Sequence, residues 1–416
     1  MRTKKTVRWE RLDNAAKIFP SASDKDRTQV FRFSCELTEP VEKEVLQRAV
    51  DKTLEDFPLY RSVLKRGLFW YYLEESNLKP EVELENQPPC SPIYDRNQKN
   101  LLFRVLYYKN RIHLEVYHVL SDGTGALQFL RALISYYLAI RYDFTAVSTD
   151  YDASDAQKAD DSFQKYYSSK KGKKKKSKNG YQLKGAKYPE SRLQVIEGIM
   201  PVKSVIDKAH EYQATVTEFL AAVLLCAIHD EMSLRARKRP VVLGIPVNLR
   251  NYFASASARN FFNMVNIGYD FKDGACDLKS VAAYVKGAFN RELTSENLMK
   301  QMNSYSAIEH NFLARITPLA VKDIALRIVY NVSSNEATAV LSNIGKVTMP
   351  DKLTPYIKLF NVCVSTNRLQ ICMCSYRDKM AVTFTSPFVS SEIQKRFFRT
   401  LSTMGIDIEI IANRNE

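Results

Sequence analysis

The sequence predicts a mixed α/β protein built from two domains, and three observations support this fold class. The chain has 416 residues, of which 45% are hydrophobic and 11% aromatic, ample for a large core and long for one domain. Strand-like alternation and helix-like spacing of apolar residues occur in both halves. Between the halves, residues 145–190 have little apolar content. We therefore expect α+β domains at 1–160 and 191–416, joined by a lysine-rich linker or loop at 161–190.

The first half mixes strands and helices. Alternating apolar residues predict strands at 29–38 and 67–75, and apolar residues at helical spacing predict a helix at 40–58. The segments "LLFRVLYY" and "RIHLEVYH" predict a hairpin that turns at Lys109 and Asn110.

The second half repeats this mixture. Residues 201–232 predict two helices, the second capped by Thr215 or Thr217 and buried along its apolar length. The last strand-like segment predicts a hairpin at Arg377 and Asp378, and the chain is expected to end in a helix. The remaining expectations are strands at 240–250, 261–271, 338–345, 357–366 and 369–386, and helices around 278–330 and 390–404.

The charge is strongly basic. Lys and Arg number 61 and Asp and Glu 46, a net charge of +15, and seven of the lysines lie in the run "KKGKKKKSK" at 170–178. Without that run the surplus is about +8, which suits a polyanionic or phosphate-bearing ligand more than a cationic one. We expect the run to be a disordered surface loop that chemistry does not need. Its role would be none, or a weak, salt-sensitive attraction to an anionic membrane, nucleic acid or carrier protein.

Targeting and metal signals are weak. The opening "MRTKKTVRWERLD" has no apolar signal region, and the longest apolar run, "FLAAVLLCAI", falls far short of the roughly 20 residues that cross a bilayer. The seven cysteines are scattered without zinc-site spacing. We expect a cytoplasmic monomer with reduced thiols, no bound metal, no transmembrane segment and no nucleic-acid partner.

The stretch "EVYHVLSDGTGALQFL" at 115–130 is the strongest chemical signal. Strand alternation puts His118 on the apolar face of its strand, together with Ile112, Leu114 and Val116. The following "SDGTG" predicts a tight turn that leads into a helix, so an imidazole would stand at the corner.

Such a corner can hold a general base. A histidine packed in the core, followed by a helix-capping Asp122 and a turn residue Gly123, would give the same sequence pattern. The pattern alone therefore leaves both a catalytic and a structural role for His118 open. We do not expect Ser121 to be a nucleophile that His118 activates, because three residues of tight turn seldom align a nucleophile with its base. Nucleotide-binding loops and Gly-x-Ser-x-Gly elbows are absent from the sequence.

With these residues the chain resembles the His-x-x-x-Asp-Gly acyltransferase superfamily, which includes chloramphenicol acetyltransferases, condensation domains of peptide synthetases and alcohol acetyltransferases. The resemblance covers nearly the whole chain, and the opening and the "SNIG" segment are most similar to alcohol acetyltransferase-like proteins. Besides "HVLSDG" at 118–123, it rests on "RLDNAAKIFP" (11–20), "FPLYRSVL" (57–64), "LGIPVNLR" (243–250), "NFFNMVNIGY" (260–269) and "LSNIGKV" (341–347).

The resemblance implies two chloramphenicol acetyltransferase-like domains, each a mixed sheet flanked by helices, with a tunnel along their interface. Acyl-CoA would be the co-substrate, a small hydroxyl-bearing molecule the acceptor, and no cofactor would stay bound. His118 would be the general base, and Asp122 and Gly123 would be structural, with Asp122 paired to Arg250. Candidates for oxyanion stabilisation or tunnel lining are Ser342, Asn343, Ser365 and Thr366.

Two departures from the superfamily matter. Tyr117 stands where condensation domains have the first histidine of a His-His pair, and the Asp-Phe-Gly-Trp-Gly motif of plant members is absent. Both argue against those subgroups and leave the acceptor open. Our first hypothesis is an acyl-CoA-dependent O-acyltransferase. The alternatives are a condensation-like enzyme that takes its acyl group from an acidic carrier protein, and a catalytically silent binding relative.

Overall fold

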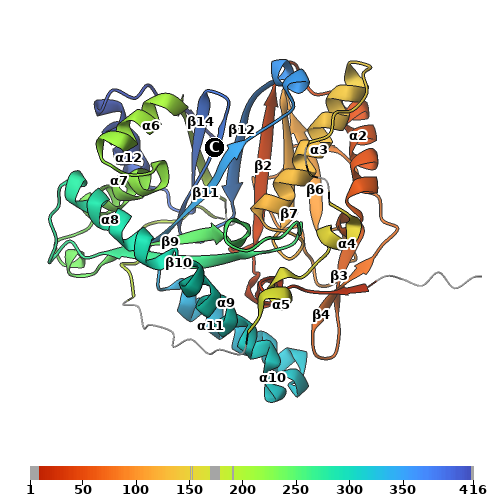
Figure 1. Ribbon diagram of the computed structural model, residues 1–416, viewed down its shortest axis with the longest axis horizontal. Helices are drawn as coiled ribbons and strands as arrows, with labels where there is room; N and C mark the ends of the chain where they lie inside the picture. Colours follow the sequence, from red (N-terminus) through yellow and green to blue (C-terminus); the bar gives the residue numbers. More distant parts are fainter. Residues whose placement is uncertain (1–8, 150, 152, 169–178, 190–191, 414–416) are drawn as a thin grey trace, which may run out of the picture.

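Figure 1 shows the computed structural model, which describes residues 9–149, 151, 153–168, 179–189 and 192–413. Within these ranges the strands form three sheets, and helices pack against them. The mixed α/β class is therefore confirmed. The lysine run at 170–178 lies outside the described residues, while the part of the expected linker before it contains the short helix α5 (Ser162–Tyr166).

The five-stranded sheet has the order β12-β2-β7-β6-β5, and its pairs are antiparallel except β5 with β6. In Figure 1, α2 (Lys43–Asp56) and α3 (Gly123–Arg141) lie on the right of this sheet. The expected hairpin is confirmed, with Lys109 in the left-handed region at φ 51°. The strands are β2 (Val30–Leu37), β5 (Glu83–Leu84), β6 (Phe103–Tyr108), β7 (Arg111–Tyr117) and β12 (Ile357–Val364).

One strand of this sheet comes from the other half of the sequence. β12 pairs antiparallel with β2, so the two halves share a sheet as well as an interface. The domain boundaries at residues 160 and 191 remain predictions.

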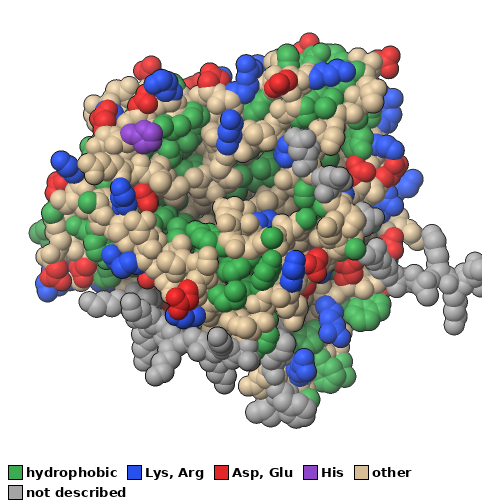
Figure 2. All heavy atoms as spheres, viewed as in Figure 1, with side chains coloured by type: hydrophobic (Ala, Val, Ile, Leu, Met, Phe, Trp, Pro, Cys, Tyr) green, Lys and Arg blue, Asp and Glu red, His purple; other side chains and the backbone are tan. Residues whose placement is uncertain are grey.

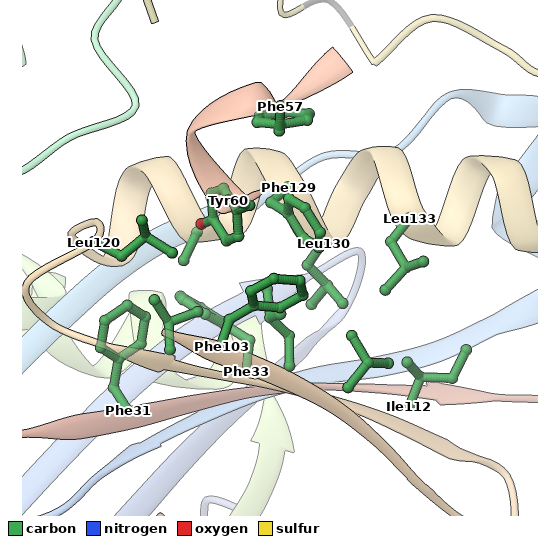
Figure 3. Close-up of a cluster of buried hydrophobic side chains, with 14 of the residues drawn as sticks. Phe31, Phe33, Phe57, Tyr60, Phe103, Ile112, Leu120, Phe129, Leu130 and Leu133 are labelled. Atoms are coloured by element: carbon green, nitrogen blue, oxygen red, sulfur yellow. The ribbon is translucent and has the colours of Figure 1, made fainter. Parts of the chain in front are cut away.

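The core beside this sheet is built on aromatic rings. Tyr60 and Phe129 stack with ring centroids 4.1 Å apart, and Phe103 meets both rings edge-on. Figure 3 shows these side chains pointing into one space from α3, from the sheet and from the turn after α2. Large rings supply much of the apolar area that holds a helix layer on a sheet. The position of α3, and hence of its first turn, depends on this cluster.

The seven-stranded sheet has the order β10-β9-β11-β13-β14-β8-β15 and is mixed, because β11 runs parallel to both β9 and β13. The helices at the left of Figure 1 flank it. The strands are β8 (Gln194–Pro201), β9 (Val241–Asn248), β10 (Phe262–Tyr269), β11 (Ala339–Val347), β13 (Leu369–Tyr376), β14 (Lys379–Ser386) and β15 (Glu409–Ala412). The flanking helices are α6 (Val202–Glu211), α7 (Val216–Asp230), α8 (Leu278–Glu292) and α12 (Glu392–Thr403).

Two strands of this sheet were not expected. The sequence of β8 does not predict a strand, because Glu197 and Gly198 interrupt its alternation of apolar residues. Glu197 is a buried carboxylate that binds Arg111 of the other half. The expectation that the chain ends in a helix is wrong, because α12 is followed by the four-residue strand β15. This strand pairs with β8 at the edge of the sheet. The C-terminal hairpin at Arg377 is confirmed.

Helix α7 begins where a capping residue was expected. Thr215 accepts a hydrogen bond from the Glu218 backbone N–H, and the Glu218 carboxylate accepts one from the Thr215 N–H. This capping box satisfies two donors that the first turn leaves open. None of the described helices could by itself cross a membrane, and α6 with α7 meets the length and hydropathy requirement only as a pair bent by 78°.

The remaining elements lie around these layers. A small sheet has the order β1-β4-β3, and α9, α10 and α11 extend at the lower end of the view in Figure 1. They are β1 (Trp9–Arg11), β3 (Ser62–Arg66), β4 (Tyr71–Glu75), α1 (Phe19–Ala22), α4 (Asp155–Lys158), α9 (Ser295–His310), α10 (Phe312–Ile316) and α11 (Leu319–Ser334).

Replacing Phe129 by alanine should lower the free energy of unfolding by about 3–5 kcal/mol, because it leaves a cavity in the aromatic cluster. Urea unfolding measures the change. The matched control is Leu234→Ala, since Leu234 is 81% exposed and should shift stability by less than about 0.5 kcal/mol. Equal effects of the two substitutions would contradict a central role for the cluster.

Candidate active site

His118 lies directly after β7, at the corner expected from the sequence. Its backbone N–H donates to the Gln29 carbonyl oxygen, which carries the pairing of β7 with β2 one residue beyond the strand. The Leu120 N–H then donates to the Tyr117 carbonyl and turns the chain towards α3. Strand, tight turn and helix therefore fix the backbone on both sides of the imidazole.

Asp122 fixes the turn from within. One carboxylate oxygen, Oδ1, accepts the Gly125 N–H at 2.9 Å and so caps α3. The other, Oδ2, accepts the Phe261 N–H at 2.8 Å and Nη1 of Arg250 at 2.7 Å. The side chains of Asp122 and Arg250 are 6% and 10% exposed, so the predicted buried ion pair is confirmed.

Arg250 connects this turn to a loop of the second half. Its guanidinium also donates to the carbonyl oxygens of Ser257 and Arg259, at 2.8 and 2.6 Å. The loop then closes on the turn so tightly that a Cβ on Gly125 would overlap the Ala258 carbonyl oxygen. Glycine is therefore required at this point of close approach.

The next residue of that loop, Asn260, holds the imidazole. Its amide nitrogen donates to the His118 carbonyl oxygen and to Oδ2 of Asp13, at 3.0 and 3.1 Å. Its amide oxygen lies 3.0 Å from Nδ1 of His118. Because that oxygen can only accept, Nδ1 must carry the proton. Nε2 is then left with a lone pair, which is the form that a general base needs.

Asp13 anchors this amide from the N-terminal segment. It is fully buried, accepts the backbone N–H groups of Ala16 and Asn260, and lies 3.6 Å from Nε of Arg259. Burial raises the pKa of the Asp13 carboxyl, against the lowering effect of Arg259. The neutral amide of Asn260 thus orients the imidazole, and the buried Asp13 carboxyl in turn hydrogen-bonds that amide.

Aromatic rings surround the other sides of the imidazole. Phe19 stacks on it with centroids 4.8 Å apart, and Phe31 and Phe262 lie 4.9 and 5.5 Å away. Burial lowers the pKa of His118 below its usual range, more than the Asn260 hydrogen bond and the charge of Asp122 raise it. His118 is consequently neutral at neutral pH and able to accept a proton.

His118 lines a cavity of about 1120 Å³ between the two halves. Phe19 and Phe31 contribute from the first half, and Ile245 and Phe262 from the second. The four candidates for oxyanion stabilisation, Ser342, Asn343, Ser365 and Thr366, also line this cavity.

Hydrogen bonds already orient the Asn343 amide and two of the three hydroxyl groups. Oγ of Ser365 accepts the Val30 N–H at 3.2 Å, and Oγ1 of Thr366 accepts the Arg368 N–H at 3.1 Å. Each hydroxyl proton is therefore left to be donated elsewhere. The stabilising role of the four residues remains a prediction.

Sequence reasoning missed Asp13 and Asn260. Both lie inside stretches on which the resemblance rests, "RLDNAAKIFP" and "NFFNMVNIGY", yet they are 247 positions apart. Only the packing of the two halves brings them to His118. Within the described part of the chain, no cluster of three His, Cys, Asp or Glu side chains could hold a metal ion.

Comparison with known proteins bears on the fold. No family model matches the chain, and no curated protein matches it in sequence. Its structure is similar to the starter condensation domain of rhizomide synthetase RzmA in complex with C8-CoA and Leu-SNAC, with a TM-score of 0.62, 13% identity and coverage of 95% of this chain and 94% of that one. The chain has the condensation-domain fold.

Two further structures share this fold. Trichothecene 15-O-acetyltransferase TRI3 from Fusarium sporotrichioides has a TM-score of 0.59 and 12% identity, over 95% of this chain and 94% of that one. Polyketide synthase associated protein 5 from Mycobacterium tuberculosis has a TM-score of 0.59 and 15% identity, over 97% and 98%. The condensation-domain fold confirms the architecture that the sequence resemblance implied.

Tyr117, the position at which the sequence departs from condensation domains, faces away from this chemistry. Its side chain is fully buried, its hydroxyl lies 2.8 Å from Oγ of Ser23, and its ring stacks on Tyr94. Burial raises the pKa of the Tyr117 hydroxyl far above its usual range, so it stays protonated. His118 therefore has no second titratable partner from the residue before it.

The ion pair predicts a large loss of stability when one partner is removed. Asp122→Ala should lower the free energy of unfolding by about 3–5 kcal/mol, because the Arg250 charge stays buried without its partner. The control is Asp277→Ala, since Asp277 caps α8 through the Ser280 N–H and its carboxylate is exposed, so a much smaller loss is expected. Denaturant unfolding that gives the same small loss for both would reduce Asp122 to a helix cap.

Proposed function

We propose that this protein is an acyl-CoA-dependent O-acyltransferase that moves an acyl group from the thioester to a hydroxyl-bearing acceptor, with His118 as the general base. The observation that carries the proposal is the hydrogen bond from Nδ1 of His118 to Asn260, which leaves a basic Nε2 on an imidazole that lines the central cavity. Similarity to a condensation domain solved with C8-CoA and to a 15-O-acetyltransferase supports it.

The protein's main tasks in this reaction are to align the acceptor oxygen with the thioester carbonyl and to remove the hydroxyl proton. A thioester carbonyl is already activated, so the acceptor oxygen attacks it while Nε2 of His118 takes the hydroxyl proton. The developing oxyanion needs donors, for which Ser342, Asn343, Ser365 and Thr366 are the candidates. Collapse of the intermediate expels the CoA thiolate, and the proton on His118 returns to that sulfur.

A condensation-like reaction that takes its acyl group from a carrier protein is the second candidate. Similarity to the starter condensation domain of rhizomide synthetase favours it. Incubating the purified chain with a panel of alcohols and a thiol reagent separates the two, when the acyl donor is acetyl-CoA or a longer acyl-CoA in one series and an acylated carrier protein in the other. Release of CoA thiol that depends on the alcohol supports the first candidate, whereas transfer from acylated carrier protein alone supports the second.

Replacing His118 by alanine should reduce kcat by about 10²- to 10⁴-fold and leave acyl-CoA affinity nearly unchanged, because proton removal contributes in the transition state and not in binding. Steady-state kinetics and acyl-CoA titration measure the two quantities. His210→Ala is the matched control, since His210 is exposed on α6 and should keep full activity. A folded His118→Ala protein with wild-type kcat would contradict the catalytic role and show that His118 only packs in the core.

The pH dependence should follow the lowered pKa of His118. The neutral imidazole is the active form, so kcat/KM should fall as pH drops through the pKa of His118 in the free enzyme. Because burial lowers that pKa, the fall should be centred below the ordinary histidine value of about 6.5. A pH profile of kcat/KM tests this. An acidic limb centred above that value would contradict a buried neutral base.

A further inference from the structure

Arg368 brings a positive charge into the cavity that contains His118. It ends the connection from β12 to β13, which passes from the five-stranded to the seven-stranded sheet, and it lines the cavity. Figure 2 shows the molecule hollowed near its middle, where hydrophobic and uncharged groups prevail, while charged side chains gather around the rim. A partly buried charge is costly unless it has a partner. The partners of Arg368 therefore have to be accounted for.

The Arg368 guanidinium has protein partners on one side. Its Nη1 donates to the carbonyl oxygens of Ser334 and Ala337, in the connection from α11 to β11. Its Nε and Nη2 make no hydrogen bond to the described residues, yet neither is sealed from solvent. The Nε–H and Nη2–H groups form the edge of a guanidinium that matches the two oxygens of one carboxylate. One complete binding edge is thus left open within the described part of the chain.

The acidic side chains of the cavity are already engaged. Those among the described residues are Asp122, Glu218 and Glu336. The first is paired with Arg250, the second completes the capping box of α7, and the third accepts the Asn266 amide at 3.0 Å. No carboxylate of the described residues forms an ion pair with Arg368.

The other arginine at this end of the cavity, Arg27, has a carboxylate partner. Its Nη2 lies 2.5 Å from Oδ2 of Asp24, and its Nη1 donates to Asn331 at 2.6 Å. Arg368 receives no such compensation: burial lowers its pKa, Tyr330 raises it, and the charge of Arg27 lowers it further. An anion in the cavity would therefore stabilise the Arg368 charge.

Arg368 and His118 approach the cavity from two sides of the same strand, β2. On one side, the His118 N–H donates to the Gln29 carbonyl. On the other side, the Ser365 N–H donates to the Val30 carbonyl, three residues before Arg368. Neighbouring strands lie about 4.8 Å apart, so a substrate that reacts at His118 can present a second group to Arg368 on the order of 10 Å away.

We propose that the open edge of Arg368 binds a carboxylate of a substrate, carried either by the acceptor, as in a hydroxy acid, or by the far end of the acyl chain. This inference rests on the proposed acyl transfer and names its substrate class. A planar guanidinium edge and a carboxylate make two parallel hydrogen bonds, which a neutral group cannot replace. The phosphates of CoA are a poorer match, because the extended pantetheine arm holds them farther from the thioester than this separation.

Calorimetric titration of the full chain tests the subsite without turnover. The probes are fatty acids of six to twelve carbons with a terminal hydroxyl, and their methyl esters as neutral counterparts. The wild type should bind an acid of suitable length more tightly than its ester. Arg368→Gln should weaken binding of that acid about tenfold or more and leave the ester unaffected, because the paired hydrogen bonds are lost. Arg399→Gln is the matched control, since Arg399 is exposed on α12 and does not line the cavity.

Transfer kinetics then identify which substrate carries the carboxylate. In one arm, acetyl-CoA donates to the hydroxy acid or to its methyl ester. In the other, suberyl-CoA or octanoyl-CoA donates to a neutral alcohol. Arg368→Gln should lower kcat/KM about tenfold for the carboxylate-bearing member of one pair and leave its neutral counterpart unchanged, whereas a merely structural role would lower both together. Arg368→Lys keeps the charge without the fork and should retain part of the preference.

Three results would overturn the proposal. The first is a wild type that binds acid and ester equally, a comparison that needs no variant to fold. The second is a folded Arg368→Gln protein that keeps the wild-type preference for the acid. The third is a variant that loses affinity for every acyl-CoA alike, which would assign the open edge to the phosphates of CoA.

Failure of the proposed function would look different. A wild type that transfers no acyl group from CoA to any acceptor would contradict the acyltransferase activity. The difference in binding between acid and ester would then still stand, and Arg368 would remain the carboxylate-binding group of the cavity.

Discussion

The ion pair between Asp122 and Arg250 is the constraint on which the candidate site depends. It joins the turn before α3 to the end of β9, two segments 128 positions apart in the sequence. Burying two charges is costly unless both are fully hydrogen-bonded. Here the Asp122 carboxylate accepts three donors, and the Arg250 guanidinium is shared between that carboxylate and three further oxygens. The same guanidinium holds the loop that carries Asn260. Because Asn260 hydrogen-bonds His118, the position of the imidazole depends on the ion pair.

The hydrogen-bond partner of His118 determines the tautomer and the charge of its imidazole. A carboxylate beside Nδ1 would favour the imidazolium and raise the pKa, whereas the Asn260 amide fixes the tautomer at little electrostatic cost. Asp122 cannot take that place, because both of its oxygens are committed elsewhere. For the proposed transfer from an already activated thioester, a neutral, buried imidazole is sufficient. The geometry therefore suits proton removal from a hydroxyl more than stabilisation of a positive charge.

Helix α11 links this chemistry to the outside of the molecule. Its polar residues bind the first half, its inner apolar residues line the cavity, and its outer apolar residues face solvent. A helix with so few buried residues owes its place to polar anchors, because it has little packing to hold it.

The sequence by itself determined the local features. Alternation and helical spacing predicted β2, β7, α2 and α7, a tight turn was evident in "SDGTG", and resemblance paired Asp122 with Arg250. These features depend on neighbours within a few residues or on a motif. Tertiary structure decided the rest. Asp13 and Asn260 reach His118 only when the halves pack, and β8 and β15 form strands by pairing with β14 and β8. The outward stripe of α11 follows the same rule, since periodicity reveals that a helix is amphipathic and only its anchors decide which side faces the water.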